Sequence, residues 1–214
     1  MKAAGHVLGR ALAIGLLAFL IFGPLANLLL WAFAERWYFP GKIPQAFGFT
    51  FWARVFEPRG GAVQSLVTSV WIALLTVAFC LAVAVPAGYA LARLKLPWRA
   101  AILLLFLLPQ AIPNLPIYVN IARMFYELRL NGTVLGVALV HAAHGLVLAV
   151  WIASAAFAAV DLQLEEAARN LGAGPWRCFA SVTLPLAAPG LVASAIFVFL
   201  ESLDEFTGTY FVGV

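Results

Sequence analysis

Five apolar runs, each long enough to cross a lipid bilayer as a helix, constrain this chain more than any other feature of its sequence. Crossing about 30 Å of hydrocarbon takes roughly 20 apolar residues in a helix. The runs cover residues 11–34, 62–92, 100–126, 134–160 and 187–214. Hydrophobic residues make up 64% of the chain and charged residues 10%, a balance far from that of soluble domains. We therefore predict an all-α, polytopic membrane protein with about five spanning helices in a single transmembrane domain over residues 1–214.

The connectors between these runs limit the chemistry that the chain can do alone. They are too short for a second, water-soluble domain, and no stretch reads G-x-x-x-x-G-K-[ST], the loop that cradles nucleotide phosphates. Cys80 and Cys178 stand in different contexts, which favours neither a disulfide nor a metal site. The net charge of +4 is modest, and we expect no nucleic-acid partner. We predict that the chain is not an enzyme, binds no cofactor itself, and depends on another polypeptide for any ATP-driven step.

The first apolar run also resembles a secretory signal, because Lys2 and Arg10 precede it. Its length favours a retained spanning helix, since the apolar core of a signal has only about 7–15 residues. Arg93, Lys95 and Arg99 form the tightest basic cluster, in a very short loop where positive charge marks the cytoplasmic side most strongly. We therefore expect this loop, and with it the amino terminus, to lie in the cytoplasm.

The third run is interrupted by prolines and polar residues between positions 109 and 116. Broken helices at membrane depth usually line a cavity. A short helix capped by a proline-rich loop explains the same residues, and the sequence favours neither interpretation over the other.

Two histidines of the fourth run, His141 and His144, share one helical face. Such a pair could ligate a metal or relay protons. The sequence offers no complementary ligand at a fixed spacing, so we favour packing or hydrogen bonding between helices.

A polar connector at residues 161–185 separates the fourth and fifth runs. Asp161 is suited to cap a short amphipathic helix, and Gly172 to adopt the left-handed conformation that ends one. Pro175 then restarts the chain, because a proline in the first turn of a helix needs no N–H partner. We expect this second helix to stop at Pro185. Helix, turn and helix would make a small exposed elbow, narrow enough to enter a groove on another protein.

The spacing of residues in this elbow makes a family resemblance specific. From Glu166 to Pro185 the chain reads E-A-A, three residues, G, nine residues, an aliphatic residue, one residue, then L-P. This matches the cytoplasmic signature loop of inner-membrane permease subunits of bacterial ABC importers, with Val182 at the usual isoleucine position. The resemblance extends from about the second apolar run to Val214. It implies a bundle like that of a type I ABC importer permease, with residues 161–185 as its coupling loop.

In that family the loop forms a coupling helix that seats in a cleft of the ATP-hydrolysing subunit. The resemblance assigns this coupling to Glu166, Ala167, Ala168, Leu171, Gly172, Ala173, Val182, Leu184 and Pro185. Glu166 matches the acidic residue that pairs with a basic group of the ATPase. The implied partners are an ATPase subunit with its ATP and Mg, a second permease subunit, a periplasmic solute-binding protein and the bacterial inner membrane. Family members usually continue through one more spanning helix, so we expect a sixth helix to be missing after residue 214.

The last run contains three carboxylates, Glu201, Asp204 and Glu205, which their spacing puts on one helical face. Carboxylates at membrane depth are costly and normally face a cavity or an ion path, whereas at the outer interface they cost little. Both interpretations stay open. With Tyr118 and Asn120 as neighbours, the favoured one is an acidic lining of the substrate path that tolerates a cation.

A second resemblance concerns the solute. Residues 202–206 look like the corresponding segment of spermidine/putrescine-type permeases, which implies a polyamine as the transported solute. Related permeases for ferric iron, thiamine or other small solutes stay open, because transporters of this type take their specificity largely from the separate binding protein.

Two other functional classes explain parts of the sequence. A secondary carrier driven by an ion gradient would use His141, His144 and the carboxylates as a proton relay, without an ATPase subunit. Inverted repeats would favour it, and none is evident. An intramembrane hydrolase would need a nucleophile beside a base, and neither Ser181 nor Ser194 has a convincing partner. The importer permease is therefore the favoured prediction.

Overall fold

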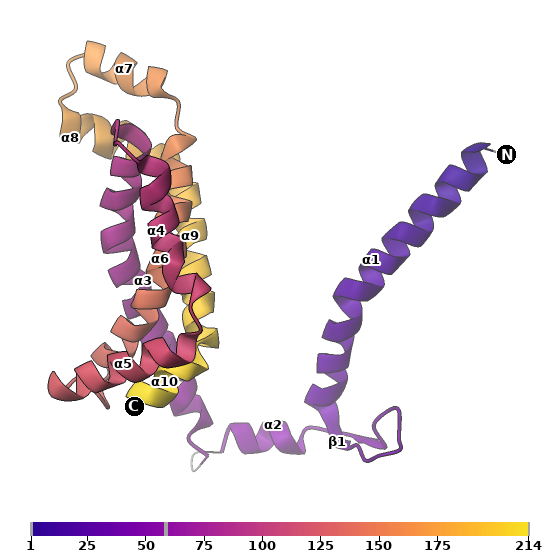
Figure 1. The fold of residues 1–214 in the computed structure, drawn as a ribbon. Coiled ribbons are helices and arrows are strands. Elements are labelled where there is room, and N and C mark those ends of the chain that lie inside the picture. Colours follow the sequence, from indigo (N-terminus) through magenta and orange to yellow (C-terminus); the bar gives the residue numbers. More distant parts are fainter. Residues whose placement is uncertain (1, 58–59, 214) are drawn as a thin grey trace. The chain divides into compact units, whose positions relative to one another are not determined.

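Helices make up most of the protein, which we analysed as a computed structural model describing residues 2–57 and 60–213 (Figure 1). The chain divides into two compact units, Met1–Ser65 and Leu66–Val214.

The first unit begins with the long helix α1 (Lys2–Phe33), so the predicted run at residues 11–34 is helical. In the most apolar window of α1, none of the residues is buried within the protein. A helix that is apolar all round and uncovered by protein is suited to face lipid. α1 therefore has the surface of a membrane-spanning helix.

Two short antiparallel strands, β1 (Ala34–Arg36) and β2 (Ala46–Phe47), follow α1, and helix α2 (Thr50–Val55) comes after them. The indole Nε1 of Trp52 donates to the carbonyl O of Ala32 at 2.7 Å and so ties α2 to the last turn of α1. Glu35 accepts a hydrogen bond from the Thr50 backbone N at 3.0 Å. Hydrogen bonds from Thr50 hold the pKa of the Glu35 carboxyl below its usual value.

Helix α6 (Val134–Ala158) forms the centre of the second unit and packs against both α3 (Ala62–Arg93) and α9 (Leu184–Asp204). Small residues let these helices approach closely. A Cβ atom added to Gly88 of α3 would lie 2.8 Å from Cβ of Ala153, and one added to Gly190 of α9 would lie 2.5 Å from Cβ of Ala156. At these two glycines the helix backbones therefore approach closely.

The third apolar run forms two helices, α4 (Arg99–Ala111) and α5 (Asn114–Glu127), bent by 91° relative to each other. Pro113 has no N–H and favours an extended residue before it, so Ile112 takes φ −95° and ψ 136° and the helix stops. The helix resumes at Asn114, so the interpretation as a proline-rich loop is wrong. In residues 2–57 and 60–213, four helices are long and apolar enough to span a membrane, or five if this bent pair is one span.

The last apolar run, residues 187–214, is not the single helix that we predicted. The helix long enough to span covers Pro175–Asp204 instead. It consists of α8 (Pro175–Cys178), the π-helical turn η1 (Phe179–Thr183) and α9. Glu205, with ψ 90°, interrupts the chain before a separate short helix, α10 (Phe206–Val212).

Pro185 does not stop the helix, so that prediction is also wrong. In the wider turn of η1 the N–H of Leu184 bonds to the carbonyl of Phe179, five residues earlier. Pro185 follows this wider turn directly, and the helix continues through it into α9. The second half of the elbow thus continues directly into a spanning helix.

Candidate functional site

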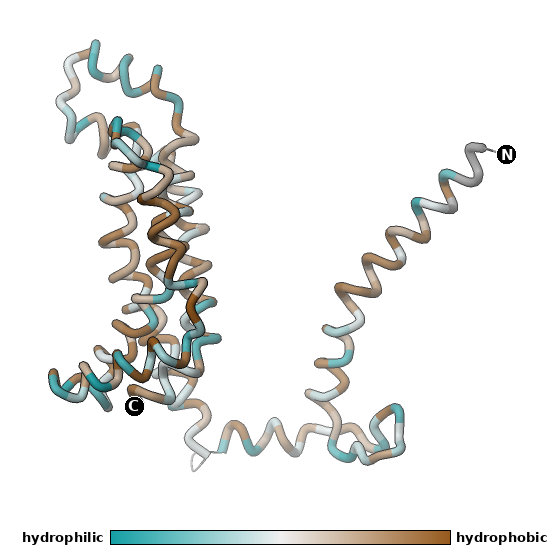
Figure 2. The backbone as a smooth tube through the Cα atoms, viewed as in Figure 1, coloured by the Kyte–Doolittle hydropathy of each residue, from teal (hydrophilic) through white to brown (hydrophobic). Residues whose placement is uncertain are grey.

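The predicted elbow lies at one end of the helices of the second unit (Figure 1), and Figure 2 shows hydrophilic residues gathered in its first helix, α7 (Leu162–Asn170). Asp161 caps α7 as predicted, because its Oδ1 accepts a backbone N–H two residues ahead at 2.9 Å. Gly172 has φ +89°, the left-handed conformation predicted for the end of this helix. Pro175 is the first residue of α8. The local structure of the elbow therefore follows from its sequence up to this proline.

The two ends of the signature meet across a groove of about 500 Å³. The lining residues come from α7 and the turn after it, from η1 and from the start of α9: Leu164, Ala167, Ala168, Leu171, Ser181, Val182, Pro185 and Leu186. Ala167, Ala168, Leu171, Val182 and Pro185 are predicted coupling residues. Leu171 is 89% exposed, although burying a leucine is worth roughly 1.5–3 kcal/mol. The groove is a largely apolar surface that nothing within the chain covers among the described residues.

Four predicted coupling residues lie outside the lining of this groove. Glu166 is exposed on α7, while Gly172 and Ala173 form the turn after the helix. Leu184 is half-buried and packs against the core around α6. The predicted coupling residues therefore have different surroundings: five line the groove, one is an exposed acidic residue, two form a turn and one packs against the core.

A buried carboxylate that the sequence reasoning missed lies next to exposed Glu166. Glu165 is 2% exposed, and its Oε1 accepts a hydrogen bond from Nε of Arg93 at 2.8 Å. Nη2 of the same guanidinium donates to the carbonyl O of Val160 at 2.8 Å. Arg93 is the last residue of α3. The basic cluster drew attention to this arginine, but no pattern in the sequence pairs two residues that are 72 positions apart.

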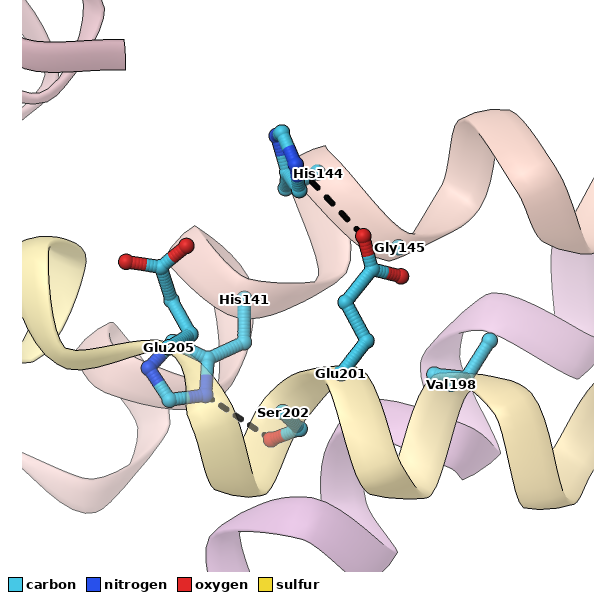
Figure 3. A pocket seen from close by; sticks show the side chains of 7 residues that line it. All are labelled: His141, His144, Gly145, Val198, Glu201, Ser202 and Glu205. Carbon is cyan, nitrogen blue, oxygen red and sulfur yellow. Dashed lines mark hydrogen bonds and ion pairs between the residues drawn. The ribbon is translucent and has the colours of Figure 1, made fainter. Parts of the chain in front are cut away.

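A polar cluster lies at the other end of α9, where α6, α9 and α10 meet (Figure 3). His141 bonds through Nδ1 to Oγ of Ser202 at 2.8 Å and through Nε2 to Oγ1 of Thr209 at 2.9 Å. His144 Nε2 lies 3.4 Å from Oε1 of Glu201. The favoured interpretation of the two histidines, polar contacts between helices, is therefore confirmed. Within the described part of the chain, no group of three His, Cys, Asp or Glu side chains is arranged to hold a metal ion.

The three carboxylates predicted on one helical face are separated by the break after α9. Glu205 lies at the break, and its Oε1 accepts the N–H of Gly208 at 2.8 Å, which caps α10. The prediction of one shared face is therefore wrong for Glu205, because this residue has left the helix. The structure brings Tyr118 to the same carboxylate: its hydroxyl donates to Oε2 at 2.7 Å.

The remaining residues of the predicted substrate path have simpler surroundings. Asp204 is exposed at the last turn of α9. Asn120 is also exposed, and its side chain donates to the carbonyl O of Pro116 within its own helix at 2.8 Å.

Comparison with known families matches more than half of the chain. The family described as binding-protein-dependent transport system inner membrane component matches residues 84–214. The matched part includes Arg93, the elbow and the polar cluster.

Transport proteins are also similar in sequence. The trehalose transport system permease protein of Mycobacterium tuberculosis is 32% identical over 164 residues, 76% of this chain and 59% of that protein. The molybdate/tungstate transport system permease protein of Thermococcus kodakarensis is 32% identical over 151 residues, 66% of this chain and 56% of that protein. The chain therefore matches less than two thirds of the length of either relative.

A solved structure has the same fold. It is the crystal structure of a bacterial ABC transporter involved in the import of the acidic polysaccharide alginate, and it matches with a TM-score of 0.74 over 100% of this chain and 76% of that chain. At 17% sequence identity the likeness concerns the fold alone. The prediction of an all-α, polytopic, permease-like bundle is confirmed.

Proposed function

This chain belongs to the family of binding-protein-dependent transport system inner membrane components, and we propose that it is one permease subunit of an ATP-driven importer. In this proposal it forms part of the path of a small solute through the bacterial inner membrane. A separate subunit binds ATP and Mg and hydrolyses the ATP, a second permease subunit completes the path, and a periplasmic protein delivers the solute. The chain itself carries out no bond chemistry.

The groove beside α7 is the observation that carries this proposal. Leu164 and Leu171, at 48% and 89% exposure, lie in the polar connector between the spanning helices Val134–Ala158 and Pro175–Asp204, and the start of the second of these helices forms the opposite wall of the groove. An apolar surface in such a connector favours a protein partner over lipid. Exposed Glu166 beside it supplies a charge that a basic group of the partner can pair with. The ATPase subunit would therefore dock on the elbow.

The connectivity of the spanning helices supports a cytoplasmic amino terminus. α1 and α3 are both long enough to span, so in this proposal each crosses the bilayer once and the chain has returned to its starting side at Arg93. Arg93 at the end of α3 contacts Glu165 of the elbow. In this proposal the elbow and the amino terminus are on the same side, which is the cytoplasmic side because the ATPase subunit uses cytoplasmic ATP.

Two substitutions on the elbow test the docking role. Leu171→Ser removes an exposed apolar side chain and Glu166→Lys reverses an exposed charge, so we expect the chain to keep its fold. Each should lower retention of the ATPase subunit in the purified complex about ten-fold or more, as expected for the loss of a central interface contact. Glu127→Lys, the same charge reversal on an exposed residue of α5, is the control. Unchanged ATPase retention and unchanged solute-stimulated hydrolysis in both elbow variants would contradict the docking role.

The class of solute is the finer part of the proposal. A polyamine was predicted from an acidic lining and from the resemblance of residues 202–206 to spermidine/putrescine-type permeases. Glu201, however, pairs with His144, and Glu205 binds Tyr118 and the start of α10. The names of the two relatives refer to trehalose and to molybdate or tungstate, none of which is a polyamine. We therefore propose a small solute whose path passes Glu201, Asp204 and Glu205, and the polyamine stays a prediction.

An uptake assay separates these solutes. Labelled polyamine, trehalose and molybdate are offered one at a time to vesicles that hold the assembled transporter. Polyamine uptake that Glu201→Gln reduces would support the acidic lining, whereas uptake of trehalose or molybdate alone would overturn it. Uptake that needs no ATPase subunit, and that stops when an ionophore collapses the ion gradient, would favour the secondary carrier instead.

A further inference from the structure

A buried ion pair connects the elbow to α3, a helix that the signature does not include. We infer that Arg93 and Glu165 are positioning residues that form a strut, so that α7 and the end of α3 move as one body when the ATPase subunit moves α7. This inference rests on the proposed function. It adds a second connection between the docking site and the spanning helices, beside the covalent joints of α7 to α6 and α8.

The geometry of Arg93 suits such a strut. Its Nε donates to Oε1 of Glu165 at 2.8 Å, and Nη2 lies 2.8 Å from the same oxygen. Nη2 also donates to the carbonyl O of Val160, directly after α6, at 2.8 Å. One planar guanidinium therefore holds three segments together: the end of α3, the end of α6 and the first turns of α7. A lysine has a single point charge on a flexible chain and does not present this rigid fork.

Other contacts also converge on Glu165. Sγ of Cys178, in α8, lies 3.6 Å from the backbone O of Glu165. Nη2 of Arg169, one turn later in α7, lies 3.6 Å from Oε2. The side chains of Arg93 and Glu165 are only 8% and 3% exposed, whereas that of Arg169 is 55% exposed. Arg93 and Glu165 are thus shielded from solvent. Arg169 is a surface charge next to the same carboxylate, so it can serve as a control.

The short joints of α7 explain why a strut matters. α7 is joined to α6 through residues 159–161 and to α8 through residues 171–174, where Gly172 and Gly174 lie. A few residues at the end of an element are enough to absorb a hinge motion. With both joints free, α7 could pivot under the ATPase subunit without moving α3. A buried charge pair is costly to separate, so the Arg93–Glu165 pair prevents α7 from rotating independently of α3.

The experiment measures solute transported per ATP in vesicles that hold the complete transporter. The double variant Arg93→Met/Glu165→Leu removes both charges, and such a replacement by apolar residues usually preserves folding. We expect it to retain the ATPase subunit and its basal hydrolysis, and to transport at least ten-fold less solute per ATP. Arg169→Met should behave like the unaltered chain. A double variant with the unaltered ratio of transport to hydrolysis would overturn the inference.

A covalent replacement of the strut gives the second test. In Arg93→Cys/Glu165→Cys the ratio should be low, and a short thiol-reactive crosslinker between the two cysteines should restore it. The native Cys80 and Cys178 are buried, which protects them from the reagent. Crosslinking that leaves the ratio low would contradict a mechanical role.

The two proposals fail in different ways. Loss of the ATPase subunit from the Arg93→Met/Glu165→Leu variant alone would make the pair part of the docking surface, which overturns the strut and keeps the proposed function. An unaltered chain that never retains an ATPase subunit would overturn the proposed function itself.

Discussion

The charge pairs near the two ends of α9 differ in burial and in the distance between their charged atoms. At the elbow, the side chains of Arg93 and Glu165 are 8% and 3% exposed and their closest atoms lie 2.8 Å apart. At the other end, the side chains of His144 and Glu201 are 17% and 21% exposed and lie 3.4 Å apart. Oε2 of Glu201 is shielded from solvent and has no hydrogen-bond partner among the described residues. The Arg93–Glu165 pair is fully bonded, and the His144–Glu201 pair is not.

This difference indicates which end can rearrange. Breaking a buried and fully bonded pair leaves a charge without compensation, whereas a longer and more exposed pair contributes less and exchanges partners more easily. The less bonded end also holds the break at Glu205 and the nearby contact with Tyr118 of α5. We therefore expect the elbow end to resist deformation and the opposite end to rearrange more easily.

Removal of the carboxylate at each end should give the largest contrast. Glu165→Leu leaves Arg93 buried without its counter-charge and should cost about 3–5 kcal/mol of stability. Glu201→Leu removes a longer and more exposed contact, together with a carboxylate oxygen that has no hydrogen-bond partner among the described residues, and should cost at most about 1 kcal/mol. The thermal unfolding midpoints of the two purified variants in one detergent measure the difference. Equal shifts would remove the distinction between the two ends.

Small substitutions at the helix contacts should give an intermediate contrast. A Cβ on Gly88 would lie 2.8 Å from the backbone N of Ser154, which cannot yield, so Gly88→Ala should cost about 1–3 kcal/mol. A Cβ on Gly145, beside His144, would meet Cγ1 of Val198 at 3.3 Å. Gly145→Ala should be close to neutral, since alanine favours the helix by about 0.5–1 kcal/mol. The same unfolding measurement applies, and a larger loss for Gly145→Ala would contradict a more adaptable end.

The turn of the elbow should give the smallest effect. Gly172 has φ +89° and Gly174 φ −66°, and a Cβ on either would meet no atom within 4 Å. Gly172→Ala should therefore be strained by about 1–2 kcal/mol through its backbone alone, and Gly174→Ala should not. Amide hydrogen exchange in the last turn of α7 would report the strain as faster exchange in the first variant only. Equal exchange in both variants would mean that the turn does not hold α7.

Local patterns predicted most of the secondary structure. The apolar runs predicted α1, α3 and α6, and the run from Asp161 to Pro175 predicted the cap, the helix and the turn of the elbow. Each of these features depends on neighbours within a few residues, because capping and turn formation are short-range effects. Pro113 likewise marked the bend between α4 and α5.

Predictions from local sequence patterns were wrong where the backbone departs from the regular α-helix. Pro185 is an ordinary stop signal, but it follows the π-helical turn of η1, and the helix continues through it. Glu205 continues the helical spacing of Glu201, yet it leaves α9 and caps α10. A proline or a helical spacing in the sequence therefore does not determine where a helix ends when the backbone around it departs from the regular α-helix.

The sequence by itself determined that the chain spans a membrane with helices, and that it carries a helical elbow between two of them. Apolar length and turn chemistry are enough for both, since each acts within one segment. Only the tertiary structure decided which of two adjacent glutamates is buried: Glu165 meets Arg93, and Glu166 stays exposed. The physical reason is that burying a charge requires a counter-charge from a distant part of the chain, and the packing of α3 against α6 brings it there.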